Sequence, residues 1–383
     1  MMRSVAVCGV GVKDLLPQND SIETIEIHGR PVTVGLIPTP EPRFDASDAS
    51  CRSAALVRVL GFSCNYRDQT LVFAPFKAGG ERGFRVVGSE FVGEVLEVGA
   101  GVEKLRPGDR VIGDNCYPPA AGGCAWGIPT NESAGEYQVL DESKLMRVPR
   151  EMPLAEAAAF SVGAQTAYAM IRRLAVSARS KVLVTAATSN TSIFVINALR
   201  KHRAAVYAAS ASPLFADRLK QLGVREVVTA ERAGGDGERA ATEHAALAEL
   251  AASVGGFDCV IDPFFDIYFA TAVELLALGG KYVTCGLAGQ YQGLAGEPFR
   301  SREPDFRRTF VRMISHNLEV VGNCLGLTED LAAAVRDYAE GSFRVTVDSV
   351  HTGARVGDFF RRTFDARDRF GKVVYLYDES SPA

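Results

Sequence analysis

Five consecutive residues have side chains that can hold an anion: Thr188, Ser189, Asn190, Thr191 and Ser192. They follow the short apolar segment 182–184, which has the composition of a buried strand, and a helix is expected to begin near Ile193. The N–H groups at a helix N-terminus attract phosphate, so these residues are candidates for binding a diphosphate. A second interpretation stays open, because Ser, Thr and Asn commonly cap helices without binding any ligand.

A second candidate group follows the apolar segment 54–61. Tyr66 carries a phenol with a pKa of about 10, which can donate a proton at neutral pH without first ionising. Its neighbour Asn65 has an amide that can donate to a carbonyl oxygen. The alternative for Tyr66 is an ordinary half-buried aromatic residue. The eight cysteines are scattered rather than clustered, so they indicate reduced thiols and not a disulfide framework.

Two sequence patterns predict the elements that position these groups. Short β-like runs punctuated by Gly, Pro and Asp fill residues 20–150 and predict an irregular β-barrel. From about 153 to 325, apolar strand cores alternate with helical segments, the pattern of a doubly wound α/β domain. The texture then reverts, with a helix at 329–340, a strand at 343–347 and a last strand at 372–376. We therefore expect one domain from 1–152 and 326–383 around a second at 153–325, with a polar loop at 231–239.

Composition excludes several classes of function. The 383 residues are 47% hydrophobic and 23% charged, which is typical of a globular protein. The formal net charge of -4 leaves no basic excess for nucleic acid or an anionic membrane. No stretch has the apolar length of a membrane span, and the N-terminus lacks the features of a secretory signal. We expect a cytoplasmic protein with no nucleic-acid or membrane partner.

Particular segments resemble the medium-chain dehydrogenase/reductase superfamily. Residues 61–68 look like the family's Gly-Val-Asn-Tyr-Arg-Asp turn, 88–95 like its Gly-His-Glu strand, and 105–111 like its barrel turn. Residues 155–168 resemble the first helix of its second domain, and 369–374 resemble its closing strand. The resemblance implies a GroES-like β-barrel domain plus a doubly wound parallel-sheet (Rossmann) domain, and a homodimer built through the last strands of the latter.

The resemblance also identifies where metal ligands would be. In zinc-dependent relatives the catalytic ligands occupy the positions that are Asn65, Ser89 and Val162 in this chain. None of these is a thiolate or an imidazole, the donors that tetrahedral zinc prefers. The loop that carries structural zinc in relatives has only Cys116 and Cys124. We therefore predict no metal, which points to the zinc-free branch that reduces quinones or the C=C bond of α,β-unsaturated carbonyls.

The cofactor turn departs from the family pattern. Relatives have glycines after the first strand of the Rossmann domain, and residues 185–192 contain none. Donor side chains could replace the bare backbone, or the site could be lost. The segment 205–216 also lacks the acid that favours NAD, whereas Ser210 and Ser212 could donate to a 2'-phosphate. NADPH is therefore the expected cofactor, although these two serines also fit as caps of the following helix.

The remaining site residues are implied by position in the family. The turn that holds Asn65 and Tyr66 lines a cleft between the domains in relatives, and Asp68 is expected to organise that turn. Gln165 and Thr166 match positions facing the nicotinamide. Strand ends, where α/β sheets bind ligands, supply further cofactor candidates: Gly286, Leu287, Asn323 and Cys324.

Two other segments bear on the substrate. Phe73, Phe76 and Phe84 border the cleft in relatives and indicate an apolar or aromatic substrate, although such residues are more often core. The segment 116–127, which carries the single tryptophan Trp126, is either a substrate rim or a surface loop.

Three hypotheses follow. The first is a zinc-independent NADPH-dependent reductase of an activated C=C bond or quinone-like carbonyl, on a free or carrier-bound small molecule. The second is a non-redox biosynthetic enzyme or binding protein that has lost nicotinamide binding. The third is a zinc alcohol dehydrogenase, which requires stoichiometric metal.

Overall fold

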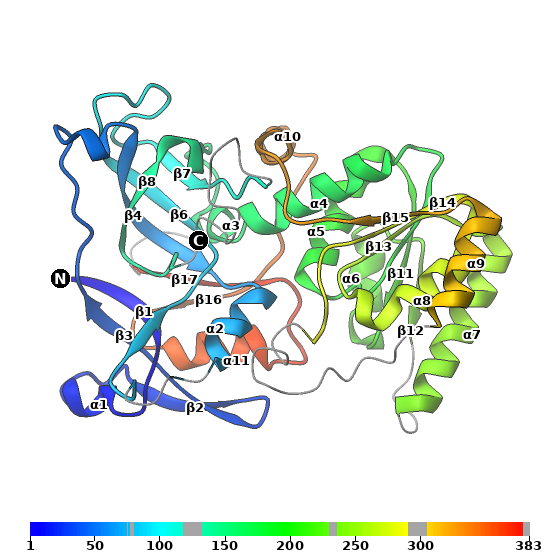
Figure 1. The fold of residues 1–383 in the computed structure, drawn as a ribbon, viewed down its shortest axis with the longest axis horizontal. Helices are drawn as coiled ribbons and strands as arrows, with labels where there is room; N and C mark the ends of the chain where they lie inside the picture. The colour runs from blue at the N-terminus through cyan, green and yellow to red at the C-terminus, as the bar shows by residue number, and fades with distance from the viewer. Residues whose placement is uncertain (75, 77–79, 118–131, 230–235, 290–304, 378–383) are drawn as a thin grey trace. The chain divides into compact units, whose positions relative to one another are not determined.

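Contacts divide the chain into two compact units (Figure 1). The computed structural model describes residues 1–74, 76, 80–117, 132–229, 236–289 and 305–377, and no side chain from 236 to 243. The first unit contains Met1–Val162 and the chain from Val345 onward, and the second takes in the described chain between them. Nothing tests the domain bounds predicted at 153 and 326, which stay a prediction.

The first unit is built from two mainly antiparallel sheets within the described residues. One has the order β2-β3-β1-β5, and the other has the order β16-β17-β4-β6-β7-β9, with β8 paired to β4. The strands are β1 (Met2–Cys8), β2 (Glu23–Ile27), β3 (Arg30–Thr39), β4 (Ala54–Ser63), β5 (Phe84–Val86), β6 (Glu90–Val98), β7 (Arg110–Gly113), β8 (Tyr137–Asp141), β9 (Leu145–Arg147), β16 (Val347–Thr352) and β17 (Lys372–Leu376). The helices are α1 (Val12–Leu15), α2 (Gln69–Phe73), α3 (Leu154–Ala158) and α11 (Val356–Phe364).

The register of three neighbouring strands brings their polar ends together at one place in this unit. Ser63 at the end of β4 lies opposite Glu90 at the start of β6, and Val374 of β17 lies opposite Ser63 on the other side. Alternating apolar residues of these strands, among them Val57, Phe62 and Phe91, face the core. The polar ends of β4, β6 and β17 are thereby held together by a rigid sheet.

The second unit has a parallel sheet with the order β12-β11-β10-β13-β14-β15 among its described residues. The strands are β10 (Lys181–Val184), β11 (Ala205–Ser210), β12 (Glu226–Thr229), β13 (Phe257–Asp262), β14 (Leu276–Thr284) and β15 (Glu319–Gly322). The helices are α4 (Ser161–Leu174), α5 (Asn190–Leu199), α6 (Ala216–Gln221), α7 (Asp236–Val254), α8 (Phe265–Leu275), α9 (Phe306–His316) and α10 (Thr328–Ala339).

The strand order reverses between β10 and β13, so successive crossovers run outward in opposite directions from this point. Right-handed crossovers therefore place α5 and α8 on opposite faces of the sheet, as Figure 1 shows. The carboxyl ends of β10 and β13 meet at the switch point, where doubly wound sheets bind ligands. The α/β class and the two predicted sheet types are confirmed.

Three local predictions need correction. The strand predicted at 343–347 begins only at Val347, because the Phe343 ring is buried against Tyr168 and Phe194 in the second unit. The helix α9 was not predicted. Of the predicted loop 231–239, residues 231–235 lie outside the described chain, and the remainder opens α7. No helix of the described chain is long and apolar enough to cross a membrane.

Candidate functional site

The Asn65 side chain is at the centre of a buried hydrogen-bond network in the first unit. Its Nδ2 donates to Ser89 Oγ at 2.8 Å and to Glu90 Oε1 at 2.8 Å. Its Oδ1 accepts from Lys372 Nζ at 2.9 Å. Both amide hydrogens are thus donated inside the protein. This geometry opposes the expectation that Asn65 donates to a substrate carbonyl, and it makes Asn65 a residue that positions its neighbours.

A fully buried ion pair stabilises the same network. Lys372 Nζ lies 2.6 Å from Glu90 Oε1, and the two side chains are 1% and 0% exposed. Lys372 also donates to the carbonyl oxygen of Cys64 at 2.9 Å, while Glu90 Oε2 accepts the Val162 N–H at 2.9 Å. A buried ion pair needs such additional hydrogen bonds to offset its loss of hydration. The pair and its hydrogen bonds therefore hold the ends of β4, β6 and β17 together with Val162, the last residue of this part of the first unit.

Asp68 organises the turn that carries Tyr66, a 3₁₀ helix over Tyr66–Asp68. Its Oδ2 accepts the Asn65 N–H at 2.6 Å and the Ser89 hydroxyl at 2.7 Å. Its Oδ1 is buried without a partner among the described residues. Burial raises the pKa of the Asp68 carboxyl, against the opposing effect of these hydrogen bonds.

The three positions that hold zinc in metal-dependent relatives come together in this network. Asn65 bonds to Ser89, and the Val162 N–H reaches the Glu90 carboxylate that also accepts from Asn65. An amide, a hydroxyl and an apolar side chain do not fit a zinc ion. The nearby Cys64 thiol has its pKa raised well above the usual value by burial.

Within the described part of the chain, no group of three His, Cys, Asp or Glu residues is arranged to hold a metal ion. Cys124 and Trp126 lie outside that part, so the predicted loop at 116–127 cannot be described as a whole. Zinc independence therefore stays a prediction that rests on the chemistry of the donor set at Asn65, Ser89 and Val162.

Tyr66 differs from its buried neighbours in exposure. Its side chain is 38% exposed, whereas Asp68 is 1% exposed. The network holds the backbone on both sides of Tyr66 and leaves the phenol accessible from the surface of the first unit. Such an arrangement suits a proton donor, and the catalytic role of Tyr66 stays a prediction.

In the second unit, the turn at 185–192 agrees in part with the interpretation that its residues cap a helix. Ser189 is the N-cap of α5: its Oγ accepts the Ser192 N–H at 3.2 Å and donates to Ser192 Oγ at 3.0 Å. The buried Ser192 hydroxyl in turn donates to the Thr185 carbonyl oxygen at 2.8 Å. These two side chains are engaged in building the turn.

The other three residues of the turn lie at the start of α5, where the sequence predicted an anion site. Thr188, Asn190 and Thr191 are partly exposed, and Asn190 and Thr191 supply the first two N–H groups of α5, which the Ser189 cap does not take. No acidic residue occurs from 185 to 192. The helix N-terminus and these donors fit a diphosphate. Ala186 adopts a left-handed φ of 42°, a conformation that the family's glycines would adopt without strain.

Ser210 and Ser212 are also hydrogen bonded locally. Ser210 Oγ donates to the Ser212 carbonyl oxygen at 2.9 Å, and Ser212 Oγ accepts the Leu214 N–H at 3.2 Å. Ser212 therefore caps the short helix that follows β11, as the alternative interpretation expected. Binding of a 2'-phosphate by these serines stays a prediction.

Asp262 was missed by the sequence analysis. It ends β13 at the switch point, where it is fully buried and accepts hydroxyl hydrogens from Thr185 at 2.6 Å and Tyr282 at 2.6 Å. Burial raises its pKa. The signal was an acidic residue directly after the apolar run 259–261 of a predicted buried strand, beside the strand β10 that precedes Thr185.

Hydrogen bonds to residues of α8 hold the loop that contains Gly286 and Leu287. Asp266 accepts the N–H groups of Ala288 at 2.7 Å and Gly289 at 3.0 Å, and the Phe265 N–H donates to the Gly286 carbonyl oxygen at 3.1 Å. The loop follows β14 at the carboxyl edge of the sheet, where a cofactor site was expected.

Most of the cofactor-binding candidates on α4 and directly after β15 are buried or hydrogen bonded within the protein. Gln165 is buried and donates to the Leu327 carbonyl oxygen at 3.0 Å, and Thr166 is 7% exposed. Asn323 donates to the Leu325 carbonyl oxygen at 2.8 Å, whereas Cys324 is exposed. Roles for these residues in cofactor binding remain untested predictions.

Comparison with known proteins finds a family model for the alcohol dehydrogenase GroES-like domain, which matches residues 52–150. The chain is 31% identical over 274 residues to the spectinabilin polyketide synthase system protein NorB of Streptomyces orinoci, covering 69% of this chain and 11% of that protein. It is 32% identical over 204 residues to quinone oxidoreductase-like protein 2 of Bos taurus, covering 53% and 52%.

A solved structure of the 2-octenoyl-CoA carboxylase reductase CinF, in complex with NADP and 2-octenoyl-CoA, superposes with a TM-score of 0.73 at 22% identity. The match covers 98% of this chain and 87% of that one. At this identity the likeness establishes the fold. The chain spans about half or less of the length of the curated relatives described above.

Proposed function

The chain belongs to the medium-chain dehydrogenase/reductase superfamily, and from that premise we propose that it is a zinc-independent, NADPH-dependent reductase of an activated C=C bond or a quinone-like carbonyl. We infer from this membership that the chain is an oxidoreductase. The proposal adds the cofactor, the absence of a metal and the type of substrate.

The observation that carries the proposal is the network around Asn65. The positions of the zinc ligands hold Asn65, Ser89 and Val162, joined through Glu90 and Lys372 by hydrogen bonds of 2.6 to 2.9 Å. Without a Lewis acid at these positions, a substrate carbonyl must be polarised by a hydrogen-bond donor. Reduction of a conjugated C=C bond suits this arrangement because hydride adds to the β carbon and a proton to the α carbon.

NADPH is the cofactor that the second unit fits best. The N-terminus of α5, with Thr188, Asn190 and Thr191, would hold the diphosphate, and the acid-free end of β11 would accommodate the 2'-phosphate. The loop at Gly286 and Leu287, held by Asp266, would contact the nicotinamide end. When bound, NADPH supplies the hydride.

Tyr66 is the residue to which we assign the proton. The Tyr66 residue is 38% exposed, while the side chain of Asp68 holds the backbone of the turn through the Asn65 N–H. The Tyr66 O–H donates its proton to the α carbon, or to the carbonyl oxygen of a quinone-like substrate, and recovers one from solvent.

The names of the similar proteins support a substrate class. One is a quinone oxidoreductase-like protein, one a polyketide synthase system protein, and one a reductase bound to 2-octenoyl-CoA. We infer an α,β-unsaturated carbonyl compound, with a thioester on coenzyme A or a carrier protein as the form to test first.

The test begins with titration of the purified protein with NADPH and with NADH, monitored by nicotinamide fluorescence. We expect NADPH to be quenched or blue-shifted and NADH to bind more weakly. Saturating NADPH at one hundred times its Kd should stabilise the fold by about 2.7 kcal/mol and raise the Tm. Turnover of 2-octenoyl-CoA and a benzoquinone, in protein with less than stoichiometric metal by elemental analysis, completes the test.

A second function is favoured by one observation. The hydroxyls of Ser189, Ser192, Ser210 and Ser212 all have hydrogen-bond partners inside the second unit. A chain that kept the fold but lost nicotinamide binding, and acts as a non-redox enzyme or a binding protein, would have this property. It predicts unchanged fluorescence of both nucleotides and an unchanged Tm, which would overturn the reductase assignment.

A further inference from the structure

Basic residues are concentrated in one stretch of the second unit. Residues 163–225 contain ten lysines and arginines and a single acid, Asp217, whereas the whole chain has 42 basic and 46 acidic residues. Acids therefore outnumber basic residues over the rest of the chain. A local excess of positive charge in a chain of negative net charge indicates a surface that attracts an acidic partner.

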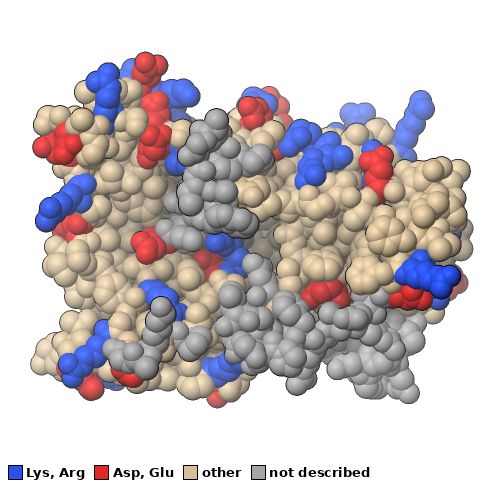
Figure 2. Space-filling model, in the orientation of Figure 1, with Lys and Arg blue, Asp and Glu red and all other residues tan. Residues whose placement is uncertain are grey.

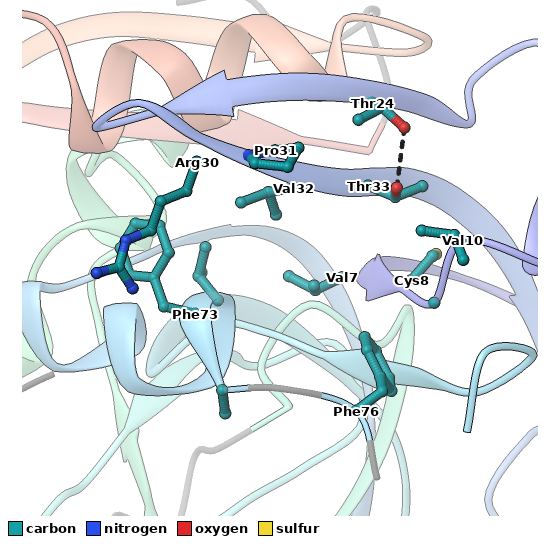
Figure 3. A pocket seen from close by; sticks show the side chains of 13 residues that line it. Val7, Cys8, Val10, Thr24, Arg30, Pro31, Val32, Thr33, Phe73 and Phe76 are labelled. Atoms are coloured by element: carbon teal, nitrogen blue, oxygen red, sulfur yellow. Dashed lines mark hydrogen bonds between the residues drawn. The ribbon is translucent and has the colours of Figure 1, made fainter. Parts of the chain in front are cut away.

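Many basic side chains of the chain are already engaged by the protein. In the first unit, the Arg30 guanidinium lies 5.8 Å from the centre of the Phe73 ring, and both line the pocket in Figure 3. In the second unit, Arg172 donates two hydrogen bonds to Asp330, at 2.7 and 2.8 Å. Lys181 Nζ donates to the carbonyl oxygen of the last residue of α7 at 2.8 Å. These cations have structural roles inside the protein.

Five basic residues of the stretch 163–225 differ from these. All five are exposed, and none of their side chains forms a hydrogen bond or an ion pair with the residues that the structure describes. They form what we call the amino-edge patch: Arg179, Arg200, Arg203, Lys220 and Arg225. Their charges are therefore accessible to a partner without competition from a described acid.

The parallel sheet brings three of these residues into a row. Arg179 and Arg203 each lie two residues before a strand, and the first residues of those strands, β10 and β11, are register partners. Arg225 directly precedes β12, and its N–H donates to a carbonyl oxygen of β11 at 2.8 Å. Because parallel strands begin at the same edge of a sheet, the three arginines lie at the amino ends of three neighbouring strands.

The other two members lie at helix ends on the same edge. Arg200 is the C-cap of α5, and Lys220 lies in the last turn of α6. The Arg200 side chain reaches the next loop, since a Cβ at Gly223 would lie 4.0 Å from Arg200 Cγ. On the far side of β10, the Asp258 carboxylate accepts the Lys181 N–H at 2.7 Å, so the basic row ends there. The patch is opposite to the carboxyl edge, where the cofactor is proposed to bind.

The spacing of the row matches that of carboxylates on a helix. Neighbouring strands lie about 4.8 Å apart, so the outer two of three strands are about 10 Å apart. Helical side chains at i and i+4 are about 5–6 Å apart, and two turns rise about 11 Å. Glutamates at i, i+4 and i+7 can therefore each meet one arginine of the row. A longer polyanion would extend over the acid-rich remainder of the chain, which opposes its binding.

We propose that the amino-edge patch binds an acidic helix of a partner protein. The carboxylates of the helix pair with Arg179, Arg203 and Arg225, and the two helix-end cations, Arg200 and Lys220, flank them. Binding at this edge needs neither nucleotide nor substrate, so its outcome is separate from the outcome of the proposed reductase function.

The test uses a fluorescently labelled, alanine-based peptide of about 20 residues with glutamates at i, i+4 and i+7, long enough to form a helix. The control peptide has glutamine at the same positions. In anisotropy titrations of the full chain at about 0.1 M salt, we expect the acidic peptide to bind about tenfold more tightly than the control. The preference should disappear at about 1 M salt, where the Debye length falls to about 3 Å. Equal affinities at the lower salt, or no binding of the acidic peptide, would overturn the proposal.

A triple variant locates the surface. Replacing the three arginines of the row by glutamine should weaken the acidic peptide about tenfold and leave the Tm unchanged, because the side chains are exposed. The matched control removes the same charge from exposed arginines of the first unit and should keep wild-type affinity. The control substitutions are Arg43→Gln, Arg52→Gln and Arg367→Gln. Equal losses in the two triple variants would show that net charge, and not the patch, attracts the peptide, and would overturn the proposal.

Two further probes distinguish an acidic helix from other anions. Oligodeoxythymidylate of about the same length as the peptide and phosphatidylserine vesicles are titrated under the same conditions. We expect both to bind more weakly than the acidic peptide. Tighter binding of either probe, lost in the triple variant of the row, would overturn the assignment to an acidic helix and identify a nucleic-acid or membrane surface.

Discussion

At the scale of single residues, the Lys372–Glu90 pair is a fully buried ion pair that joins β17 to β6. Lys372→Met leaves the Glu90 carboxylate buried without its cation, and the expected loss is about 3–5 kcal/mol in the free energy of unfolding. The partly exposed pair Lys281–Glu319 gives the matched control, and Lys281→Met should cost less than about 1 kcal/mol. Urea unfolding measures both.

The double variant Lys372→Met with Glu90→Met separates charge from packing. It removes the buried charge as well as its partner, so it should recover much of the stability that the single variant loses. A single variant within about 1 kcal/mol of the wild type would show that the pair contributes little.

Asp68 makes stability depend on pH. Burial raises its folded-state pKa above the unfolded value of about 3.9, so the folded protein binds this proton more tightly. Its contribution is therefore present at low pH and is lost as pH rises from about 4 through the raised pKa. In urea unfolding from pH 4.5 to 7.5, the advantage of the wild type over Asp68→Asn should shrink with rising pH. A constant or growing advantage contradicts this expectation.

Tyr66→Phe tests the assigned proton donor. Loss of the hydroxyl should lower kcat by about 10²- to 10⁴-fold, the usual contribution of a positioned general acid, while the Kd for NADPH stays unchanged. Tyr137→Phe, on the partly exposed strand β8, is the matched control. A wild-type kcat in Tyr66→Phe would contradict the assignment and show that Tyr66 is an ordinary aromatic residue.

The residue-level outcome shows what a single sequence can indicate. The resemblance to the family implied that Asn65, Ser89 and Val162 lie at one site, and hydrogen bonds around Glu90 bring them together. The role of Lys372 was not predicted, because 282 positions separate it from Glu90 and only the fold brings them together. The direction of the Asn65 amide was not predicted either, since it depends on that same lysine.

At the scale of elements, the start of α5 decides between the two proposed functions. Thr191→Val removes a hydroxyl from the first turn and leaves the Ser189 cap in place. If the turn binds NADPH, this variant should raise the Kd several-fold with little change in Tm, because one neutral hydrogen bond is worth about 1 kcal/mol. An unchanged Kd, measured by fluorescence titration, counts against a contact at Thr191.

Ser189→Ala is the complementary variant. It removes the N-cap that accepts the Ser192 N–H, so it should lower the free energy of unfolding by about 0.5–2 kcal/mol. Ser212→Ala removes a cap of the same type at the end of β11 and serves as the comparison. If Ser189→Ala leaves thermal stability unchanged, Ser189 is not the structural cap that its geometry indicates.

Buried elements were predicted best. The strand at the end of the chain, predicted at 372–376, is β17 with the same bounds, and all five of its residues are buried. The helix α9 was not predicted, although Phe306, Phe310 and Ile314 recur every four residues, as in an amphipathic helix. In the structure these three residues are more than half exposed. Phe343 was placed in a strand because its aromatic type favours one, whereas tertiary packing on Tyr168 overrides that preference.

At the scale of the whole molecule, charge is distributed without a dominant sign. Lysine and arginine are interspersed with aspartate and glutamate over the described part of the face shown in Figure 2. This agrees with the formal net charge of -4 and gives no electrostatic footprint for nucleic acid on that face. We therefore expect copies of this chain to associate through apolar surface and not through a charged patch.

The last strand of the second sheet is the surface on which we expect a homodimer. β15 ends the strand order, its Val320 is 41% exposed, and an open strand edge can pair with another chain. Val320→Lys should convert a dimer to a monomer in analytical ultracentrifugation, because a charge on an edge strand opposes pairing. Val350→Lys, on the edge strand β16 of the first unit, is the control and should remain dimeric. A wild-type chain that sediments as a monomer, or a Val320→Lys dimer, would exclude this edge as the interface.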